Sequence, residues 1–142
     1  MTNASADCFL DTNVLLYAAT GKKSEPRKFG IAFELVGQRT FGVSAQTLAE
    51  FYAASQKQNL GPLPADEADR WVELLARYPH TDLDADIVRR GIALSRFYSI
   101  QYYDAALLAA AERLGAPVFF TEDLNHNQVY GTVMAVNPFL EN

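Results

Sequence analysis

Cysteine and basic residues are scarce in this sequence, and each shortage excludes a class of protein. Cys8 is the only cysteine, so the chain cannot form an internal disulfide, and it fits a reducing cytoplasm. Lysine and arginine total 12 residues against 17 of aspartate and glutamate, which gives a net charge of −5. Proteins that bind nucleic acid through phosphate neutralisation alone are usually basic. Binding to nucleic acid would therefore need a local basic patch or a bound metal cation.

Long apolar runs, internal repeats and low-complexity segments are absent as well. Residues 1–7 are polar, and the apolar run after them is too short for a signal peptide. The uncharged stretch 124–140 is broken by asparagine, glutamine, glycine and proline, so we expect no membrane span. The chain does contain 49% hydrophobic residues over a length of 142, which is enough for a buried core. We predict a single domain over residues 1–142.

Short apolar runs alternate with helical patterns along the chain. The predicted strands are 8–10, 40–43, 80–83, 117–120 and 132–136. The predicted helices are 14–19, 26–36, 45–56, 65–78, 85–98, and one that starts near residue 99 and ends at Gly115. Strands separated by helices indicate a mostly parallel sheet covered by helices. The predicted fold class is therefore α/β, with a central sheet of about five short strands flanked by helices.

Local signals mark where several helices begin. Ser44 and Asp84 are predicted N-caps of helices 45–56 and 85–98, because a side-chain oxygen there can accept hydrogen bonds from free backbone amides. Ser24 is predicted to cap the helix that has Pro26 in its first turn. Helix 85–98 has a broad apolar face. Its predicted core positions are Ile87, Val88, Ile92, Leu94 and Phe97.

Acidic side chains directly follow two of the predicted strands. Asp11 comes after strand 8–10, and Glu122 and Asp123 come after strand 117–120. The carboxyl ends of parallel strands meet at one edge of a sheet, where ligands gather in open α/β folds. We therefore expect Asp11 and Asp123 to lie on the same edge. Asp11 could also serve only as an N-cap of the next helix, and this segment alone leaves both interpretations open.

Two further carboxylates can reach the same edge of the sheet. Asp104 lies in the first turn of an alanine- and leucine-rich helix, on the same face as Leu107 and Leu108. A carboxylate on an apolar face needs a partner or a cation. Glu50 lies on helix 45–56 among small neighbours, although an exposed glutamate on a helix is commonplace. Carboxylates crowded together repel one another, and a hard divalent cation such as Mg²⁺ or Mn²⁺ would offset that repulsion.

Four short motifs, in this order and spacing, resemble those of PIN domains. They are Leu10-Asp11-Thr12-Asn13, Thr47-Leu48-Ala49-Glu50, Tyr103-Asp104-Ala105-Ala106-Leu107 and Phe120-Thr121-Glu122-Asp123-Leu124. The arrangement is most similar to the VapC type, the toxins of bacterial type II toxin–antitoxin pairs. The resemblance implies a single PIN-like domain that cleaves RNA and depends on Mg²⁺ or Mn²⁺. It also implies a homodimer that is neutralised by a small antitoxin protein.

The resemblance also assigns roles to individual residues. Its acidic quartet, which would bind the metal and carry catalysis, consists of Asp11, Glu50, Asp104 and Asp123. Its supporting polar residues are Thr12, Asn13 and Thr121. Either Glu122 or Asp123 could face the cleft, although the resemblance favours Asp123. In this chemistry, bound cations lower the pKa of a water molecule that attacks phosphorus, and they offset charge on the phosphate oxygens.

A basic cluster and two competing functions complete the predictions. The cluster either forms an ordinary solvated helix start or contacts RNA phosphates, and its members are Lys22, Lys23, Arg27 and Lys28. A phosphatase of the haloacid-dehalogenase kind also has an aspartate after its first strand. That chemistry wants a second aspartate two residues later, where this chain has Asn13. The other alternative is a non-catalytic PIN-like module that binds RNA or a protein.

Overall fold

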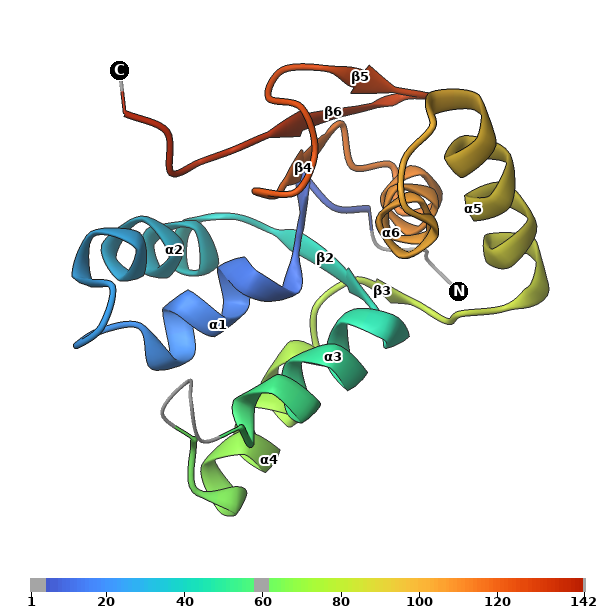
Figure 1. Cartoon of the computed structure of the whole chain (residues 1–142). Coiled ribbons are helices and arrows are strands. Elements are labelled where there is room, and N and C mark those ends of the chain that lie inside the picture. The colour runs from blue at the N-terminus through green and yellow to red at the C-terminus, as the bar shows by residue number, and fades with distance from the viewer. Residues whose placement is uncertain (1–4, 58–61, 142) are drawn as a thin grey trace.

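The computed structural model describes residues 5–57 and 62–141, which form a six-stranded sheet covered by helices (Figure 1). The strands lie in the order β3-β2-β1-β4-β6-β5, and every neighbouring pair is parallel except β5 with β6. Their bounds are β1 Cys8–Leu10, β2 Phe41–Ser44, β3 His80–Thr81, β4 Val118–Phe120, β5 Val129–Tyr130 and β6 Val133–Val136. The predicted α/β class with a mostly parallel sheet is therefore confirmed.

Six helices in the described residues cover the two faces of this sheet. Their bounds are α1 Thr12–Thr20, α2 Pro26–Gln38, α3 Ala45–Ser55, α4 Ala65–Leu75, α5 Ala85–Tyr98 and α6 Tyr102–Arg113. Figure 1 shows α5 and α6 on one side of the sheet and α1 to α4 on the other. Each side has its own hydrophobic core. None of the helices in the described part of the chain is both long and apolar enough to span a membrane.

Strand β1 lies between the two cores and contributes side chains to both. Phe9 packs into the core under α5 and α6, whereas Cys8 and Leu10 pack into the core under α1 to α4. All three side chains are fully buried. Successive side chains of a strand point to opposite faces, so a strand covered on both faces must be apolar throughout. This explains why the run ends at the first polar residue, Asp11.

Two of the three predicted helix caps are confirmed, and the third is wrong. Ser44 Oγ accepts a hydrogen bond from the Thr47 amide at 3.2 Å, and Thr47 Oγ1 accepts from the Ser44 amide at 3.2 Å, which makes a reciprocal capping box. Asp84 accepts from the Ile87 amide at 3.0 Å. Ser24 does not cap α2. Glu25 occupies the N-cap position without a side-chain hydrogen bond, and Pro26 is the first helical residue.

The predicted core face of α5 is too broad. Phe97 is 80% exposed and Ile92 is 37% exposed, whereas Ile87 and Leu94 are buried. The buried stripe also includes Gly91, at which an added Cβ would lie 3.1 Å from the Ala106 Cα of α6. Because the two helices approach so closely along this narrow stripe, side chains on either side of it remain in solvent.

Two features at the ends of the sheet complete the fold. The pair Val129–Tyr130 adds an antiparallel strand, β5, which was not predicted because two residues are too few to show an alternating pattern. Helix α6 is buried along Ala105–Ala111 and lies against the sheet, as its small side chains allow. After α6 the chain turns at Gly115, whose φ of 70° is a conformation that suits glycine.

Candidate active site

Asp11 sits between β1 and α1 and is fixed at both of its carboxylate oxygens. Its Oδ1 accepts a hydrogen bond from the Thr12 amide at 2.7 Å, and its Oδ2 accepts from Thr121 Oγ1 at 2.7 Å. The side chain is only 5% exposed. Thr121 follows the neighbouring strand β4, so the two parallel strand ends meet as predicted. Asp11 does cap α1, and it lines the cavity described below as well.

Glu122 and Asp123 point to different places. Glu122 accepts a hydrogen bond from Tyr17 Oη at 3.0 Å and pairs with Lys28 Nζ at 2.7 Å. Asp123 lines the same cavity as Asp11, and its backbone amide donates to Thr121 Oγ1 at 3.0 Å. Thr121 thus links both acids through one hydroxyl. The structure therefore brings Asp123, rather than Glu122, beside Asp11.

Glu50 is held by donors from two directions. Its Oε1 accepts from Thr12 Oγ1 at 3.1 Å, and its Oε2 accepts from Gln46 Nε2 at 3.3 Å. Gln46 Nε2 also lies 3.4 Å from the carbonyl oxygen of Tyr103, immediately before Asp104 on α6. Gln46 is only 8% exposed. It was not predicted as a site residue, although its position one turn before Glu50 was a usable signal.

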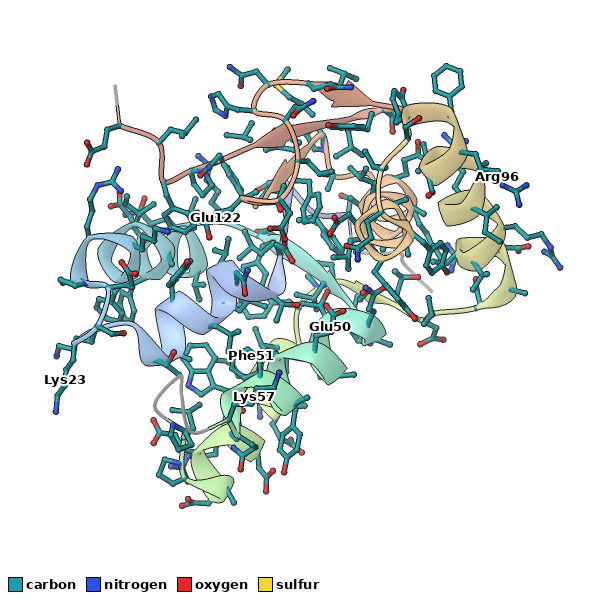
Figure 2. All side chains as sticks on the ribbon, in the orientation of Figure 1. Lys23, Glu50, Phe51, Lys57, Arg96 and Glu122 are labelled. Carbon is teal, nitrogen blue, oxygen red and sulfur yellow. The ribbon has the colours of Figure 1, made fainter. Side chains whose placement is uncertain are left out.

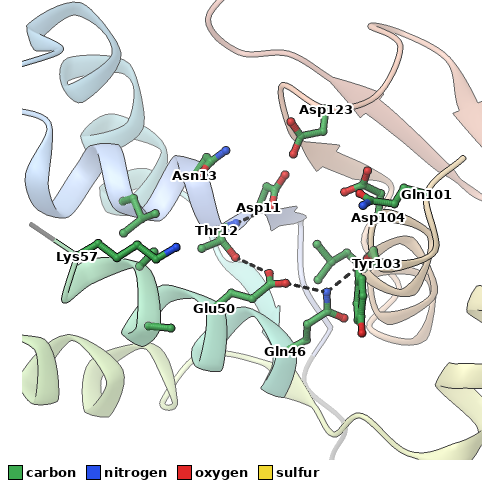
Figure 3. A pocket seen from close by; sticks show the side chains of 14 residues that line it. Asp11, Thr12, Asn13, Gln46, Glu50, Lys57, Gln101, Tyr103, Asp104 and Asp123 are labelled. Carbon is green, nitrogen blue, oxygen red and sulfur yellow. Dashed lines mark hydrogen bonds between the residues drawn. The ribbon is translucent and has the colours of Figure 1, made fainter. Parts of the chain in front are cut away.

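The four carboxylates surround one open cavity of about 420 Å³, between α1, α3, α6 and the chain after β4 (Figure 3). Its lining includes the predicted polar residues Thr12 and Asn13, whereas Thr121 lies outside the lining and contacts Asp11 through its hydroxyl. Among the described residues of its lining, Lys57 is the only cation. Its lining residues are Asp11, Thr12, Asn13, Leu16, Gln46, Glu50, Ala53, Ala54, Lys57, Gln101, Tyr103, Asp104, Leu107 and Asp123.

Burial and mutual repulsion raise the pKa of two of these acids. Burial raises the pKa of Asp11 to about 7, and the charge of Asp123 adds to the rise, whereas the hydrogen bond from Thr121 opposes it. Burial also raises the pKa of Asp104 to about 6, with further contributions from the charges of Asp123 and Glu50. The pKa of each acid is therefore raised in part by carboxylates from other segments of the chain. Perturbed acids gathered in a cleft are typical of functional sites.

The donor set of the cavity fits a hard divalent cation. Every acidic group in the lining offers oxygen, which Mg²⁺ and Mn²⁺ prefer. Among the residues that the structure describes, no three His, Cys, Asp or Glu side chains lie close enough to form a complete metal-binding cluster. Mg²⁺ does not require one, because it keeps several waters and uses one or two carboxylates together with substrate phosphates. A positive charge here would also relieve the repulsion that raises the pKa of Asp11 and Asp104.

The basic cluster at the start of α2 does not line the cavity. Lys28 pairs with Glu122, and Arg27 donates to the carbonyl oxygen of Phe139 at 2.6 Å. Lys22 and Lys23 are exposed, and Figure 2 shows Lys23 pointing away from the body of the protein. Contact between this cluster and RNA stays a prediction. The cation that does face the acids, Lys57, was missed because it lies past the regular pattern of α3.

Comparisons with known proteins identify the same family along most of the chain. Residues 8–131 match the family model of the PIN domain. A protein in a toxin–antitoxin complex from Klebsiella pneumoniae has a similar structure, with a TM-score of 0.64 and 20% identity over 92% of this chain and 97% of that one. VapC20 of Mycobacterium tuberculosis, described as a sarcin–ricin loop cleaving toxin, gives a TM-score of 0.63 and 16% identity over 82% and 91% of the two chains.

A third similar structure is VapBC2 of Rickettsia felis, which was solved bound to a DNA fragment from its promoter. It gives a TM-score of 0.58 and 16% identity over 90% of this chain and 96% of that one. No curated protein sequence matches the chain significantly. At these identities the solved structures establish the fold, and the sequence match establishes the family. The protein belongs to the PIN domain family.

Proposed function

We propose that this protein is a metal-dependent ribonuclease that acts in the cytoplasm as the toxin of a toxin–antitoxin pair. One observation carries the proposal: four carboxylates from four separate segments converge on one open cavity, and two of them have a raised pKa. Repulsion between so many negative charges disfavours the folded state unless a bound cation, alone or together with substrate, offsets it. The buried free thiol of Cys8 suits a reducing compartment.

The residues of the cavity have distinct roles in this proposal. Asp11 presents a carboxylate that is oriented by hydrogen bonds from the Thr12 amide and the Thr121 hydroxyl. Asp104 and Asp123 face it from α6 and from the chain after β4, and Glu50 faces it from α3. A bound Mg²⁺ or Mn²⁺ would lower the pKa of a water molecule and offset charge that develops on the phosphate. The carboxylates would hold that cation where an RNA phosphate can enter.

The partners are proposed from similarity. The similar solved structure from Klebsiella pneumoniae is described as a toxin–antitoxin complex, so we propose that a small antitoxin binds this chain too. The match covers almost the full length of the similar chain in that complex, which supports a comparable assembly. We also propose that it forms a homodimer. The substrate is proposed to be RNA, as the description of VapC20 indicates for that protein.

The decisive experiment compares cleavage of bulk and structured RNAs by the purified protein, with Mn²⁺ or Mg²⁺ and with EDTA. Cleavage should require the metal. In Asp11→Asn the value of kcat should fall, and the effect should not be limited to a higher KM. Asp104→Asn and Asp123→Asn should each lose most activity. The matched control is Glu122→Gln, which should retain activity because Glu122 pairs with Lys28 outside the cavity. Equal cleavage by the native protein and Asp11→Asn would reveal a contaminating nuclease and sink the proposal.

The same preparations separate the two alternative functions. A haloacid-dehalogenase-like phosphatase would hydrolyse a simple phosphate monoester, but Asn13 lines the cavity where that chemistry needs a second carboxylic acid. We therefore expect no monoester hydrolysis. A non-catalytic module would bind RNA in the presence of metal and leave it intact.

A further inference from the structure

The two rims of the acidic cavity carry different chemical groups. Lys57 lies just beyond the C-terminal end of α3, and Tyr103 lies in the first turn of α6. Figure 3 shows the Lys57 side chain reaching into the cavity from one side, while Tyr103 lies on the other, with Asp11 and Glu50 between them and Asp104 next to Tyr103. The cavity therefore has a cationic rim, an acidic floor and an aromatic rim.

Among the residues that the structure describes, Lys57 has no partner that would account for its position. Its side chain is exposed, and it forms no salt bridge to any residue that the structure describes. By contrast, Lys28 is used in the contact with Glu122. An ammonium that faces an open cavity with three free N–H donors is suited to bind a phosphate as a point charge.

Tyr103 is an exposed aromatic ring on a fixed backbone. The side chain is 58% exposed, and its ring meets the neighbouring Tyr102 ring edge-on at 5.1 Å. Its carbonyl oxygen accepts the hydrogen bond from Gln46, which ties the residue to α3 across the cavity. An exposed ring on the rim of a polar cavity offers a stacking surface for an unpaired base.

We propose that an RNA strand crosses the cavity from α3 to α6, with one backbone phosphate held by Lys57 and one unpaired base stacked on Tyr103. This inference rests on the proposed function. The scissile phosphate then lies between the two contacts, over Asp11 and Asp104. A base can stack on the Tyr103 ring only if it is not stacked and paired within a duplex. The RNA segment at the cut site must therefore be unpaired. Both residues are substrate-positioning residues, and neither takes part in the chemical step.

The phosphate contact is tested by RNA binding in the Asp11→Asn background with Mg²⁺, so that bound RNA stays intact. Lys57→Gln should weaken binding of a labelled single-stranded RNA and reduce the slope of log K against log salt by about 0.7, as expected for one lost phosphate contact. The matched control is Arg96→Gln, which removes the same charge from an exposed arginine that points away from the protein on α5 (Figure 2). It should leave the slope unchanged.

The stacking contact is tested with abasic RNAs in the same background. Tyr103→Ala should weaken binding roughly 5- to 140-fold, the range that stacking of one base gives. Its effect should disappear when the RNA carries an abasic site at one particular position. The matched control is Tyr52→Ala, because Tyr52 is 42% exposed on α3 but does not line the cavity. In the active protein, Lys57→Gln and Tyr103→Ala should raise KM more than they lower kcat.

The outcomes separate this inference from the proposed function. If the protein cleaves RNA, but Lys57→Gln keeps the salt slope of its control or Tyr103→Ala loses equal affinity on every abasic RNA, the inference is overturned and the nuclease stands. If the native protein cleaves no RNA and binds none, both are overturned. Both substitutions replace exposed side chains, so the thermal midpoints should match those of the controls.

Discussion

Asp11 combines a structural role with a costly charge. It caps α1 and anchors the end of β4 through Thr121, yet it is nearly buried beside Asp123. Burial raises the pKa of Asp11 from the ordinary 3.8 to about 7, and it raises the pKa of Asp104 from 3.8 to about 6. A group whose pKa is higher in the folded state binds protons more tightly there. Its contribution to stability is therefore complete below about pH 4 and is lost as pH rises to about 7.

This sign gives a prediction for the metal-free protein. In EDTA, the free energy of unfolding should fall between about pH 4 and pH 7, where Asp11 and Asp104 keep their protons in the folded state but lose them in the unfolded state. Asp11→Asn should reduce that fall, and urea denaturation at each pH measures it. The control is Asp84→Asn, because Arg113 lowers the pKa of Asp84 to about 2 and that group does not titrate in this window. An identical pH dependence in Asp11→Asn and the native protein would contradict the prediction.

Gln46 gives a second prediction at this scale. Its amide reaches Glu50 on its own helix and the Tyr103 carbonyl on α6, so it fixes an acid and ties two walls of the cavity together. Gln46→Met keeps the length of the side chain but removes both hydrogen bonds, which should cost about 1–3 kcal/mol of stability. Loss of such an orienting partner typically weakens metal binding by roughly 10–100-fold.

Titration of the thermal midpoint with Mn²⁺ measures both effects of the Gln46 change. Gln38→Met is the control, because Gln38 is an exposed residue at the end of α2. If Gln46→Met binds Mn²⁺ as tightly as Gln38→Met does, then Gln46 has no positioning role.

At the scale of elements, the packing of α5 against α6 positions the helix that carries Asp104. Gly91 allows this contact, since an added Cβ would lie 3.1 Å from the Ala106 Cα and 3.1 Å from the Tyr102 ring. These atoms belong to the first turns of the helix that carries Asp104. The backbone of a packed helix cannot move locally without moving its neighbours. A change at Gly91 should therefore reach the cavity.

We predict that Gly91→Ala destabilises the protein by about 1 kcal/mol, in spite of the better helix propensity of alanine. The matched control is Gly30→Ala on α2, where an added Cβ meets nothing within 4 Å. That change should stabilise the protein by about 0.4–1 kcal/mol. Denaturation in urea distinguishes the opposite signs, and equal effects of the two substitutions would show that the helices can separate freely.

At the scale of the whole molecule, the cavity links four parts of the chain. Its carboxylates come from the end of β1, from α3, from α6 and from the segment after β4. Only the folded chain brings them together, so a cation that binds there must favour the folded state. Metal binding and stability should thus be coupled.

We predict that Mn²⁺ or Mg²⁺ raises the thermal midpoint, by the equivalent of about 2.7 kcal/mol when free metal reaches a hundred times its Kd. Asp104→Asn should lose most of this gain and still fold. Asp69→Asn, which removes an exposed acid from α4, should keep it. Identical midpoints with and without millimolar metal for the native protein would mean that the acids do not form a metal site.

Much of this architecture is local and was therefore readable in the sequence. Strands β1, β2, β4 and β6 were visible as short apolar runs. Ser44 and Asp84 were recognisable as caps, because a cap depends only on residues two or three positions away. Asp11 and Asp123 could be placed together because parallel strands end at a common edge. The order of the four motifs likewise pointed to the PIN domain, which the match over residues 8–131 confirms.

The remaining features depend on packing between distant segments, which no local pattern encodes. Adjacent acids such as Glu122 and Asp123 look equivalent in sequence, and only Lys28 and Tyr17, about a hundred residues earlier, draw Glu122 away from the cavity. Phe97 belongs to an apolar pattern, but the close approach at Gly91 leaves it in solvent. The cationic and aromatic rims have the same origin, because Lys57 and Tyr103 belong to distant segments that only the folded chain brings to one cavity.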